Sequence, residues 1–223
     1  RQLDVLAHHG DLHLALRVLD HAEDIPDYWV EAAAALDAGD HGTRVFEVPG
    51  EDFASYRWGT TVDPITPGLM DRPYVARELI PYGSPPSADV LNAVDRRFQE
   101  QVAEPDAIAP MARFMGVGDI AVRSDLTYER YNTPRPRRLW ATVLAAPGLG
   151  EPIGFGGTER NQPRPGLPLL DEQELLTSPD AADPPKVAIV PRLAGEDKSL
   201  RPDSSNRSVH ATKSAVPVPR GFR

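Results

Sequence analysis

Apolar residues recur at helical spacing in three stretches of the sequence and predict amphipathic helices over residues 26–39, 87–102 and 105–116. The first helix begins at Pro26, a residue suited to a first helical turn, and Gly39 ends it. Ser87 is the expected N-cap of the second helix, and Pro105 opens the third. The apolar face of the first helix consists of Trp29, Ala32, Ala33 and Leu36.

Runs of β-branched and aromatic residues predict three strands, over residues 43–48, 119–125 and 186–190. About 70 residues containing helices separate the first two strands, which favours a crossover connection and parallel pairing. Ile120 and Val122 lie on one face of the second strand. The expected fold class is α/β, with a small, mainly parallel sheet of a few strands flanked by helices.

A segment of 34 residues, 50–83, follows the first predicted strand and has neither helical nor strand periodicity. Glycine and proline interrupt it every few residues. Its aromatic residues, Phe53, Tyr56, Trp58, Tyr74 and Tyr82, argue against disorder. Long loops that are not disordered are usually functional, so we expect an ordered functional loop here.

Proline accounts for 24 of the 223 residues, about twice its usual share, and many of the prolines follow Pro134. We therefore expect a loop-rich second half. The predicted organisation is a divergent N-terminal segment (1–24), an α/β domain (25–146) that contains the loop 50–83, a Pro/Gly-rich extension with a short strand (147–191) and a disordered tail (192–223).

Charge and composition exclude several function classes. The formal net charge of −9 argues against a nucleic-acid partner, which selects clustered lysine and arginine. The absence of cysteine excludes disulfides and thiolate metal sites. No run of about 18 apolar residues is present, so we expect no membrane span in this chain. The sequence starts at Arg1 without methionine or a signal peptide, which indicates a fragment of a longer protein.

Two patterns suggest a ligand but also have simpler interpretations. His9 and His13 are four residues apart, as in a metal-binding helix, but Gly10 stands where the zinc-protease pattern has glutamate. We favour solvated histidines and expect no metal and no cofactor. Three arginines within residues 134–138 suit a phosphate, although a solvated turn is the favoured interpretation.

The loop 50–83 has side chains suited to a sugar or sugar phosphate. Aromatic rings cover the apolar faces of sugars, and aspartate and arginine bond hydroxyl groups or phosphate oxygens. The alternative is that the aromatic residues are core anchors and the charged residues pair with each other. A hydrolase that uses two of Asp52, Asp63 and Asp71 is a further interpretation, but it needs a defined carboxyl separation that spacing in a loop does not give.

Four phrases of the sequence carry a resemblance to a known family. They are IPDYW at 25–29, TRVFEVPGEDF at 43–53, FASYRWGTTVDPITPGLMDRPYVARELIPYGSPPSADVLNAVDRRFQ at 53–99 and MGVGDIAVRSDLTYERY at 115–131. Over residues 25–155 the chain resembles the large arabinofuranosyltransferases of the actinobacterial (mycobacterial-type) cell envelope, which are polytopic glycosyltransferases of the GT-C type. The resemblance does not extend to the histidine-rich start or to the tail after Arg192.

The resemblance implies transfer of arabinofuranose from a decaprenyl-phosphate donor to the arabinan of arabinogalactan or lipoarabinomannan. This transfer takes place at the extracytoplasmic face of the plasma membrane. The family's catalytic carboxylate lies in an early loop between membrane helices, so we assign no catalytic residue here and expect the fragment alone to be inactive. The implied partners are the polyprenyl-phosphate sugar donor, the arabinan acceptor and, through the rest of the enzyme, the membrane.

We therefore predict that the loop 50–83 faces a membrane-embedded active site and positions the acceptor or the donor. The candidate substrate-binding residues are Asp52, Tyr56, Arg57, Trp58, Asp63, Asp71, Arg72, Tyr74 and Arg77. Two alternatives stay open: a non-catalytic carbohydrate-binding module, usually a β-sandwich, and a structural domain that braces membrane helices.

Overall fold

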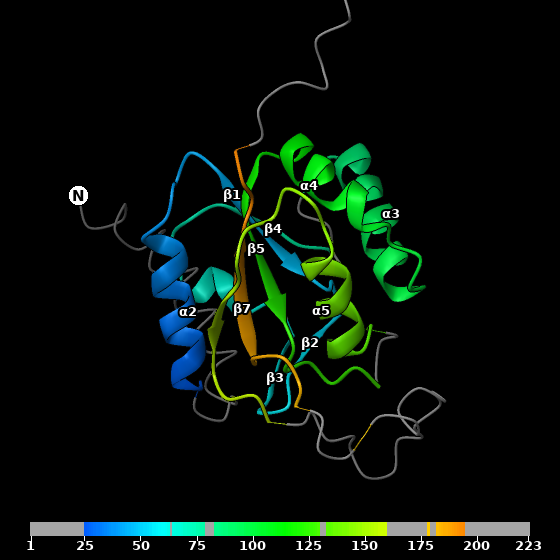
Figure 1. Ribbon diagram of the computed structural model, residues 1–223. Helices are drawn as coiled ribbons and strands as arrows, with labels where there is room; N and C mark the ends of the chain where they lie inside the picture. The colour runs from blue at the N-terminus through cyan, green and yellow to red at the C-terminus, as the bar shows by residue number, and fades with distance from the viewer. Residues whose placement is uncertain are drawn as a thin grey trace, which may run out of the picture. The chain divides into compact units, whose positions relative to one another are not determined.

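A five-stranded sheet forms the centre of the fold in the computed structural model, which describes residues 25–62, 64–78, 83–129, 133–159, 178 and 182–194 (Figure 1). Its strand order is β4-β1-β5-β7-β6. The strands are β1 (Arg44–Val48), β4 (Tyr74–Val75), β5 (Val117–Arg123), β6 (Ile153–Phe155) and β7 (Val187–Pro191). The three predicted strands are confirmed as β1, β5 and β7.

The core of the sheet is parallel. β1 pairs in parallel with β5, with Phe46 opposite Ile120, and it pairs in parallel with β4 on its other side. The predicted parallel pairing of the first two strands is therefore confirmed. β7 runs antiparallel to both β5 and β6, so the sheet as a whole is mixed.

Helices cover both faces of this sheet. They are α2 (Asp27–Asp37), α3 (Pro85–Gln99), α4 (Pro105–Phe114) and α5 (Pro136–Leu144). Figure 1 shows α2 on one side of the sheet and α3, α4 and α5 on the other. This layered arrangement confirms the α/β class and differs from the β-sandwich of most carbohydrate-binding modules.

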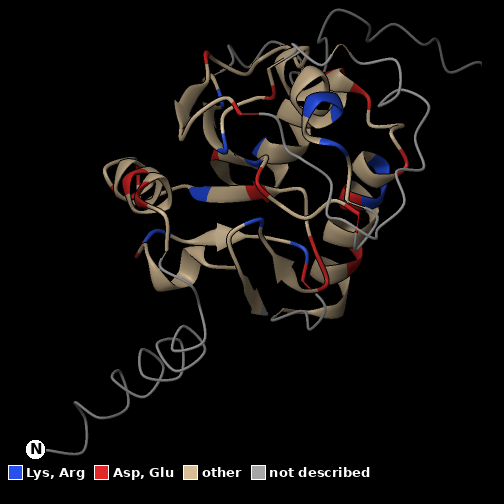
Figure 2. Ribbon diagram, turned by 90° about the horizontal axis from the view of Figure 1, so that it is seen from below, with Lys and Arg blue, Asp and Glu red and all other residues tan. Residues whose placement is uncertain are grey.

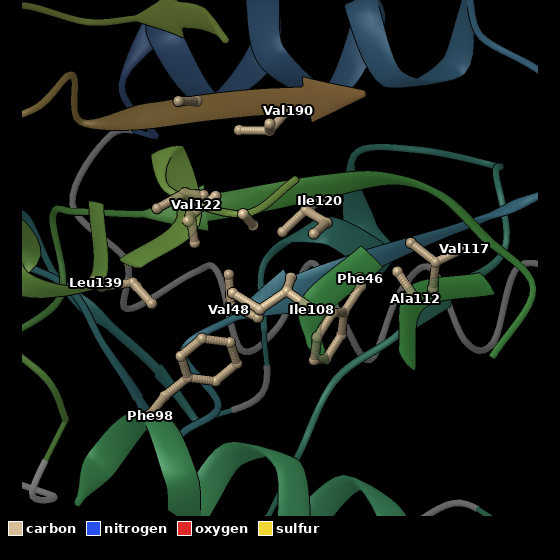
Figure 3. Close-up of a cluster of buried hydrophobic side chains, with 13 residues drawn as sticks. Phe46, Val48, Phe98, Ile108, Ala112, Val117, Ile120, Val122, Leu139 and Val190 are labelled. Carbon is tan, nitrogen blue, oxygen red and sulfur yellow. The ribbon is translucent and has the colours of Figure 1, made fainter. Parts of the chain in front are cut away.

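Apolar clusters on both faces of the sheet hold the layers together. On the α3–α5 side, Phe46, Val48, Ile120 and Val122 of the sheet pack with Phe98 and other helix residues (Figure 3). On the opposite face, α2 contributes Ala33 and Leu36, which pack against residues from β1, β5 and β7. The strand alternation that separates these clusters also places Glu47 and Arg123 on the α2 side of the sheet.

The structure corrects the boundaries of two helical regions. Ser84, not Ser87, is the N-cap of α3, and the two prolines before Ser87 occupy the first helical turn, where their missing N–H groups have no intrahelical partner to lose. Residues 136–144, expected as a turn and a short apolar segment, form α5, in which Leu139 and Val143 are buried one turn apart. In the sequence, the buried face of this helix is marked only by these two apolar residues, one turn apart.

The loop 50–83 contains more regular structure than its sequence suggests. It holds a short antiparallel pair, β2 (Ala54–Ser55) and β3 (Thr60–Val62), a 3-10 turn η1 (Thr66–Gly68), and the sheet strand β4. The expectation of no regular strand was therefore wrong. These elements are two or three residues long, too short to show a periodic pattern.

The sheet continues beyond residue 146, because β6 and β7 complete it. After β7, the N–H of Arg192 donates to the carbonyl of Gly118 at 2.7 Å. Residues 1–24 and 195–223 lie outside the described residues, and so do the predictions made for them, including those for His9 and His13. No helix in the described part of the chain combines the length and apolarity needed to cross a lipid bilayer.

Candidate functional site

A buried ion pair lies at the carboxyl ends of the two central parallel strands. Glu47 of β1 and Arg123 of β5 approach to 3.3 Å, and both side chains are at most 1% exposed. Arg123 also donates to the backbone carbonyl of Pro49, at the point where the chain leaves β1. In open α/β sheets, ligand sites gather outside such strand ends.

The loop returns over this pair because it forms backbone hydrogen bonds to the segment after β5. The N–H of Arg57 donates to the carbonyl of Asp125 at 2.8 Å, and the N–H of Thr127 donates to the carbonyl of Ser55 at 2.7 Å. Tyr56 and Leu126 form an antiparallel bridge between these contacts. Residues 55–57 are thereby fixed against residues 125–127.

Asp125 accepts three side-chain hydrogen bonds on one carboxylate oxygen. The donors to its Oδ2 are the hydroxyl of Tyr28 at 2.9 Å, the indole N–H of Trp29 at 2.9 Å and the indole N–H of Trp58 at 3.0 Å. Two donors come from α2 and one from the loop. We call these four residues the Asp125 cluster; it joins α2, the loop and the end of β5.

Tyr56 forms the aromatic floor beneath Trp58. Its ring stacks on the Trp58 ring with centroids 4.7 Å apart, and it meets the ring of Trp29 edge-on at 5.6 Å. The Tyr56 side chain is fully buried, and its hydroxyl accepts the N–H of Ile65 at 3.2 Å. Tyr56 is thus enclosed by the protein, whereas the half-buried Trp58 lies above it.

The buried carboxyl groups outnumber the buried guanidinium. Burial raises the pKa of Glu47, and the charge of Arg123 opposes that rise. Burial raises the pKa of Glu51 to about 7, again opposed by Arg123. Burial also raises the pKa of Asp125, against the stabilising effect of its three donors. The pKa of Glu51 places the ionisation of this one carboxyl near neutral pH.

Arg57 and Tyr128 lie beside Trp58 at the rim of the site. The guanidinium of Arg57 pairs with Glu129 at 3.0 Å and lies 5.0 Å from the centre of the Tyr128 ring. Arg135 lies 4.8 Å from the same ring. Arg57 and Trp58 are only half-buried, so they can contact a molecule outside the fold.

Arg72 anchors the part of the loop that lies near the amino ends of the strands. Its buried guanidinium pairs with Asp119 at 2.6 Å and donates to the carbonyls of Leu36 and Thr43 at 3.1 and 3.2 Å. Its backbone N–H donates to Asp37 at 2.9 Å. These contacts are internal to the protein, and they tie the loop to the end of α2.

Arg77, in the last part of the loop, pairs with Asp52, near its start. Arg77 also pairs with the buried Asp95 of α3 at 3.0 Å. The other oxygen of Asp95 accepts the N–H of Gly50 at 2.7 Å. Figure 2 shows acidic and basic positions interspersed along the ribbon.

The predicted substrate-binding residues therefore fall into separate groups. Tyr56, Arg57 and Trp58 gather at the carboxyl ends of the strands. Asp71 is exposed, and its N–H donates to Asp37 at 3.0 Å, while Tyr74 lies in the edge strand β4. Asp63 lies outside the described residues. Asp52 and Asp71 sit toward opposite ends of β1, so this pair does not form the two-carboxylate site of a glycosidase.

Sequence reasoning missed the buried members of the site: Glu47, Glu51, Arg123 and Asp125. The available signal was an ionisable residue inside or directly after an apolar strand, as in the phrases VFEVPGE and IAVRSD. Charged residues are almost never fully buried unless they are paired. The expected turn of basic residues at 134–138 instead supplies the N-cap of α5, Arg135, and the pair Arg137–Asp183 at 2.6 Å.

The contacts of this arrangement brace the loop against α2 and the end of β5. Oδ2 of Asp125 is occupied by three donors, and Glu47 and Glu51 are buried, so these three carboxylates are not placed to reach an external substrate. Among the described residues, no group of three His, Cys, Asp or Glu side chains could hold a metal ion. At the rim of this site, Arg57 and Trp58 are half-buried.

Comparison with known proteins identifies the family. Residues 5–190 match the family model described as alpha-(1->3)-arabinofuranosyltransferase, N-terminal GT-C domain. The chain belongs to this family. It is 34% identical over 144 residues to the alpha-(1->3)-arabinofuranosyltransferase of Mycolicibacterium smegmatis and 33% identical over 147 residues to that of Mycobacterium tuberculosis. These matches cover 60% and 64% of the chain but only 10% of either relative.

The fold is also similar to a solved structure of this family. The electron cryo-microscopy structure of the arabinofuranosyltransferase AftD from mycobacteria matches with a TM-score of 0.65 and 28% identity, over 77% of this chain and 12% of that one. A mutant of AftD, R1389S, matches with a TM-score of 0.60 over 78% of this chain and 13% of that one. The chain thus spans about a tenth of the length of its family relatives.

Proposed function

We propose that this chain is an extracytoplasmic α/β segment of a membrane arabinofuranosyltransferase and that its loop 50–83 positions a glycan beside a membrane-embedded active site. The donor is a polyprenyl-phosphate arabinofuranose, the decaprenyl form by resemblance, and the acceptor is cell-wall arabinan. Catalysis is carried by residues outside this chain. The family match over residues 5–190 supports the enzyme class.

The observation that carries the positioning role is the fixation of Trp58. A stacked Tyr56 ring and the carboxylate of Asp125 hold its indole at the carboxyl ends of β1 and β5, while the side chain stays half-buried. A preorganised aromatic ring binds the apolar face of a sugar with little loss of conformational entropy. The neighbouring Arg57, held by Glu129 and 17% exposed, borders this ring, and a guanidinium suits sugar hydroxyls or a phosphate.

Four of the other predicted binding residues serve this role indirectly. Arg72 fixes the loop beside the amino ends of the strands, and the Arg77–Asp52–Asp95 group joins the last part of the loop to its beginning. We therefore assign substrate contact to Arg57 and Trp58, and a positioning role to Asp52, Tyr56, Arg72 and Arg77. A domain that only braces membrane helices would need the same internal contacts, so the test is made on a partly exposed residue of the loop.

The test is Arg57→Ala in a complete transferase that carries this segment. We expect arabinosyl transfer to fall at least tenfold while the protein accumulates normally. Arg113→Ala, at an exposed position near the end of α4, is the matched control and should retain transfer. Unchanged transfer by Arg57→Ala, at normal protein level, would exclude the proposed role of this residue.

A further inference from the structure

A cavity of ≈ 400 Å³ lies between the edge strand β4 and helix α3, apart from the Asp125 cluster. Ligand pockets in proteins are typically about 300–1,000 Å³, so this volume accommodates a small molecule or one or two sugar units. The lining residues that matter for its chemistry are Arg44, Tyr74, Glu78, Ser87, Leu91 and Asn92.

The floor of this cavity belongs to the packed fold. Val75 of β4 and Leu91 of α3 line it, and both also pack against the apolar cluster on the α3–α5 side of the sheet. Tyr74 is half-buried, and its hydroxyl donates to Oε1 of Glu78 at 3.3 Å. An aromatic ring and aliphatic side chains thus form a surface suited to the C–H face of a ligand.

The rim of the cavity is polar and nearly balanced in charge. Arg44 and Glu78 contribute opposite charges, while Ser87 and Asn92 add a hydroxyl and an amide. Arg77, a further lining cation, is already paired with Asp52 and Asp95. Hydroxyl groups both donate and accept, so this mixture of donors and acceptors suits a neutral polyhydroxylated ligand better than a phosphate.

We propose that the groove between β4 and α3 is a carbohydrate subsite that binds a furanose unit of the glycan acceptor. The assignment to the acceptor rests on the proposed function, whereas the preference for a neutral sugar rests on the cavity. Tyr74 faces the ring of the sugar, and Glu78, Asn92 and Arg44 bond its hydroxyls. Since β4 belongs to the loop 50–83, this subsite and Trp58 lie on one continuous segment.

The test introduces a large side chain into the cavity from helix α3. Ala88 lines the cavity, whereas Ala93 is exposed on the same helix and does not line it. Ala88→Trp and Ala93→Trp are therefore matched substitutions in the 223-residue chain. Binding of an arabinofuranose trisaccharide is measured from amide chemical shifts, with arabinose 5-phosphate as the charged probe.

We expect the trisaccharide to shift the amides of residues 74–78 and 87–92, Ala88→Trp to weaken its affinity at least tenfold, and Ala93→Trp to change it less than twofold. The inference is overturned if these amides do not move, if Ala88→Trp binds like the unmodified chain, or if arabinose 5-phosphate binds in preference to the neutral sugar.

The two proposals fail separately. If Arg57→Ala abolishes transfer in the complete enzyme but the cavity binds no trisaccharide, the loop retains its role and the subsite is wrong. If the trisaccharide binds the cavity but Arg57→Ala and Trp58→Ala transfer arabinose normally, the subsite stands and the role of these two residues is wrong.

Asn92→Ala on the exposed side of α3 should weaken trisaccharide binding without unfolding the chain, because alanine favours helix.

Discussion

The indole N–H of Trp58 donates to Oδ2 of Asp125 at 3.0 Å, across 67 positions of sequence. The same oxygen accepts the indole N–H of Trp29 at 2.9 Å. One carboxylate therefore joins the functional loop to α2 and to the end of β5. The orientation of Trp58 depends on a residue that is almost completely buried, since Asp125 is only 1% exposed.

Asp125→Ala should destabilise the chain by about 3–5 kcal/mol, because it leaves two buried or half-buried indole N–H groups and a tyrosine hydroxyl without their acceptor. Asp125→Asn should cost less, since an amide oxygen can still accept these bonds. Chemical denaturation of the chain measures both values. Equal losses for the two variants would show that charge, and not hydrogen-bond acceptance, is what this position provides.

Arg72→Met should destabilise the fold by about 3–5 kcal/mol, because it leaves Asp119 and two backbone carbonyls without their buried donor. Arg72→Lys should not restore stability, since an ammonium group does not reproduce the fork of the guanidinium. The matched control is Arg96→Ala, which removes an exposed ion pair with Glu100 and should leave the denaturation midpoint unchanged. A midpoint for Arg72→Lys equal to that of the unmodified chain would contradict the assignment.

Gly50→Ala should destabilise the chain because a methyl group at this position has no room. A Cβ atom at residue 50 would lie 2.6 Å from Cβ of Arg77 and 3.1 Å from Cγ of Asp95. The resulting shift would also strain the bond from the Gly50 N–H to Asp95. We expect a loss of about 1–3 kcal/mol in chemical denaturation, the usual range for overpacking. Gly68→Ala is the control, since a Cβ atom there meets nothing within 4 Å.

Glu51 should make the stability of the chain depend on pH. Burial raises its pKa from 4.5 in the unfolded chain to about 7 in the folded state, so the folded state binds this proton more tightly. Its contribution to the free energy of unfolding is then greatest below pH 4.5 and is lost as the pH rises through about 7. The difference amounts to about 3 kcal/mol.

In the unmodified chain the Ser55 N–H donates to Oε2 of Glu51 at 2.8 Å. Glu51→Gln removes the titration of this side chain and keeps an oxygen that can accept the same bond. Relative to the unmodified chain, the variant should gain stability between pH 4.5 and pH 8. Denaturation curves at both pH values measure the gain. A stability difference that does not change with pH would contradict the raised pKa.

The main elements of the fold could be predicted because each has its own local pattern. The β-branched run at residues 43–48 predicts β1, and Trp29 with Leu36 marks the buried face of α2. By contrast, β4 has two residues and exists only because it pairs with β1. Such an element depends on tertiary contacts, which local propensity does not contain.

The site could be predicted only in part for the same reason. The aromatic composition of the loop identified Tyr56 and Trp58, but their partner Asp125 lies in another segment. Composition also grouped Arg72 with Arg57, although Arg72 braces the amino ends of the strands and Arg57 lies at the carboxyl ends. Sequence proximity within a loop that contains several turns does not determine which residues share a site.

The most direct test of the positioning role is the acceptor dependence of arabinosyl transfer by a complete enzyme with Trp58→Ala, Trp58→Phe or Trp140→Phe. Trp140→Phe is the matched control, because Trp140 is a half-buried tryptophan of α5 that packs against the apolar cluster on the α3–α5 side of the sheet, away from the Asp125 cluster. We predict that Trp58→Ala raises the KM for the acceptor at least tenfold with little change in kcat, that Trp58→Phe keeps most of the affinity through its ring, and that Trp140→Phe leaves KM unchanged. A normally folded Trp58→Ala enzyme with an unchanged KM would contradict the account.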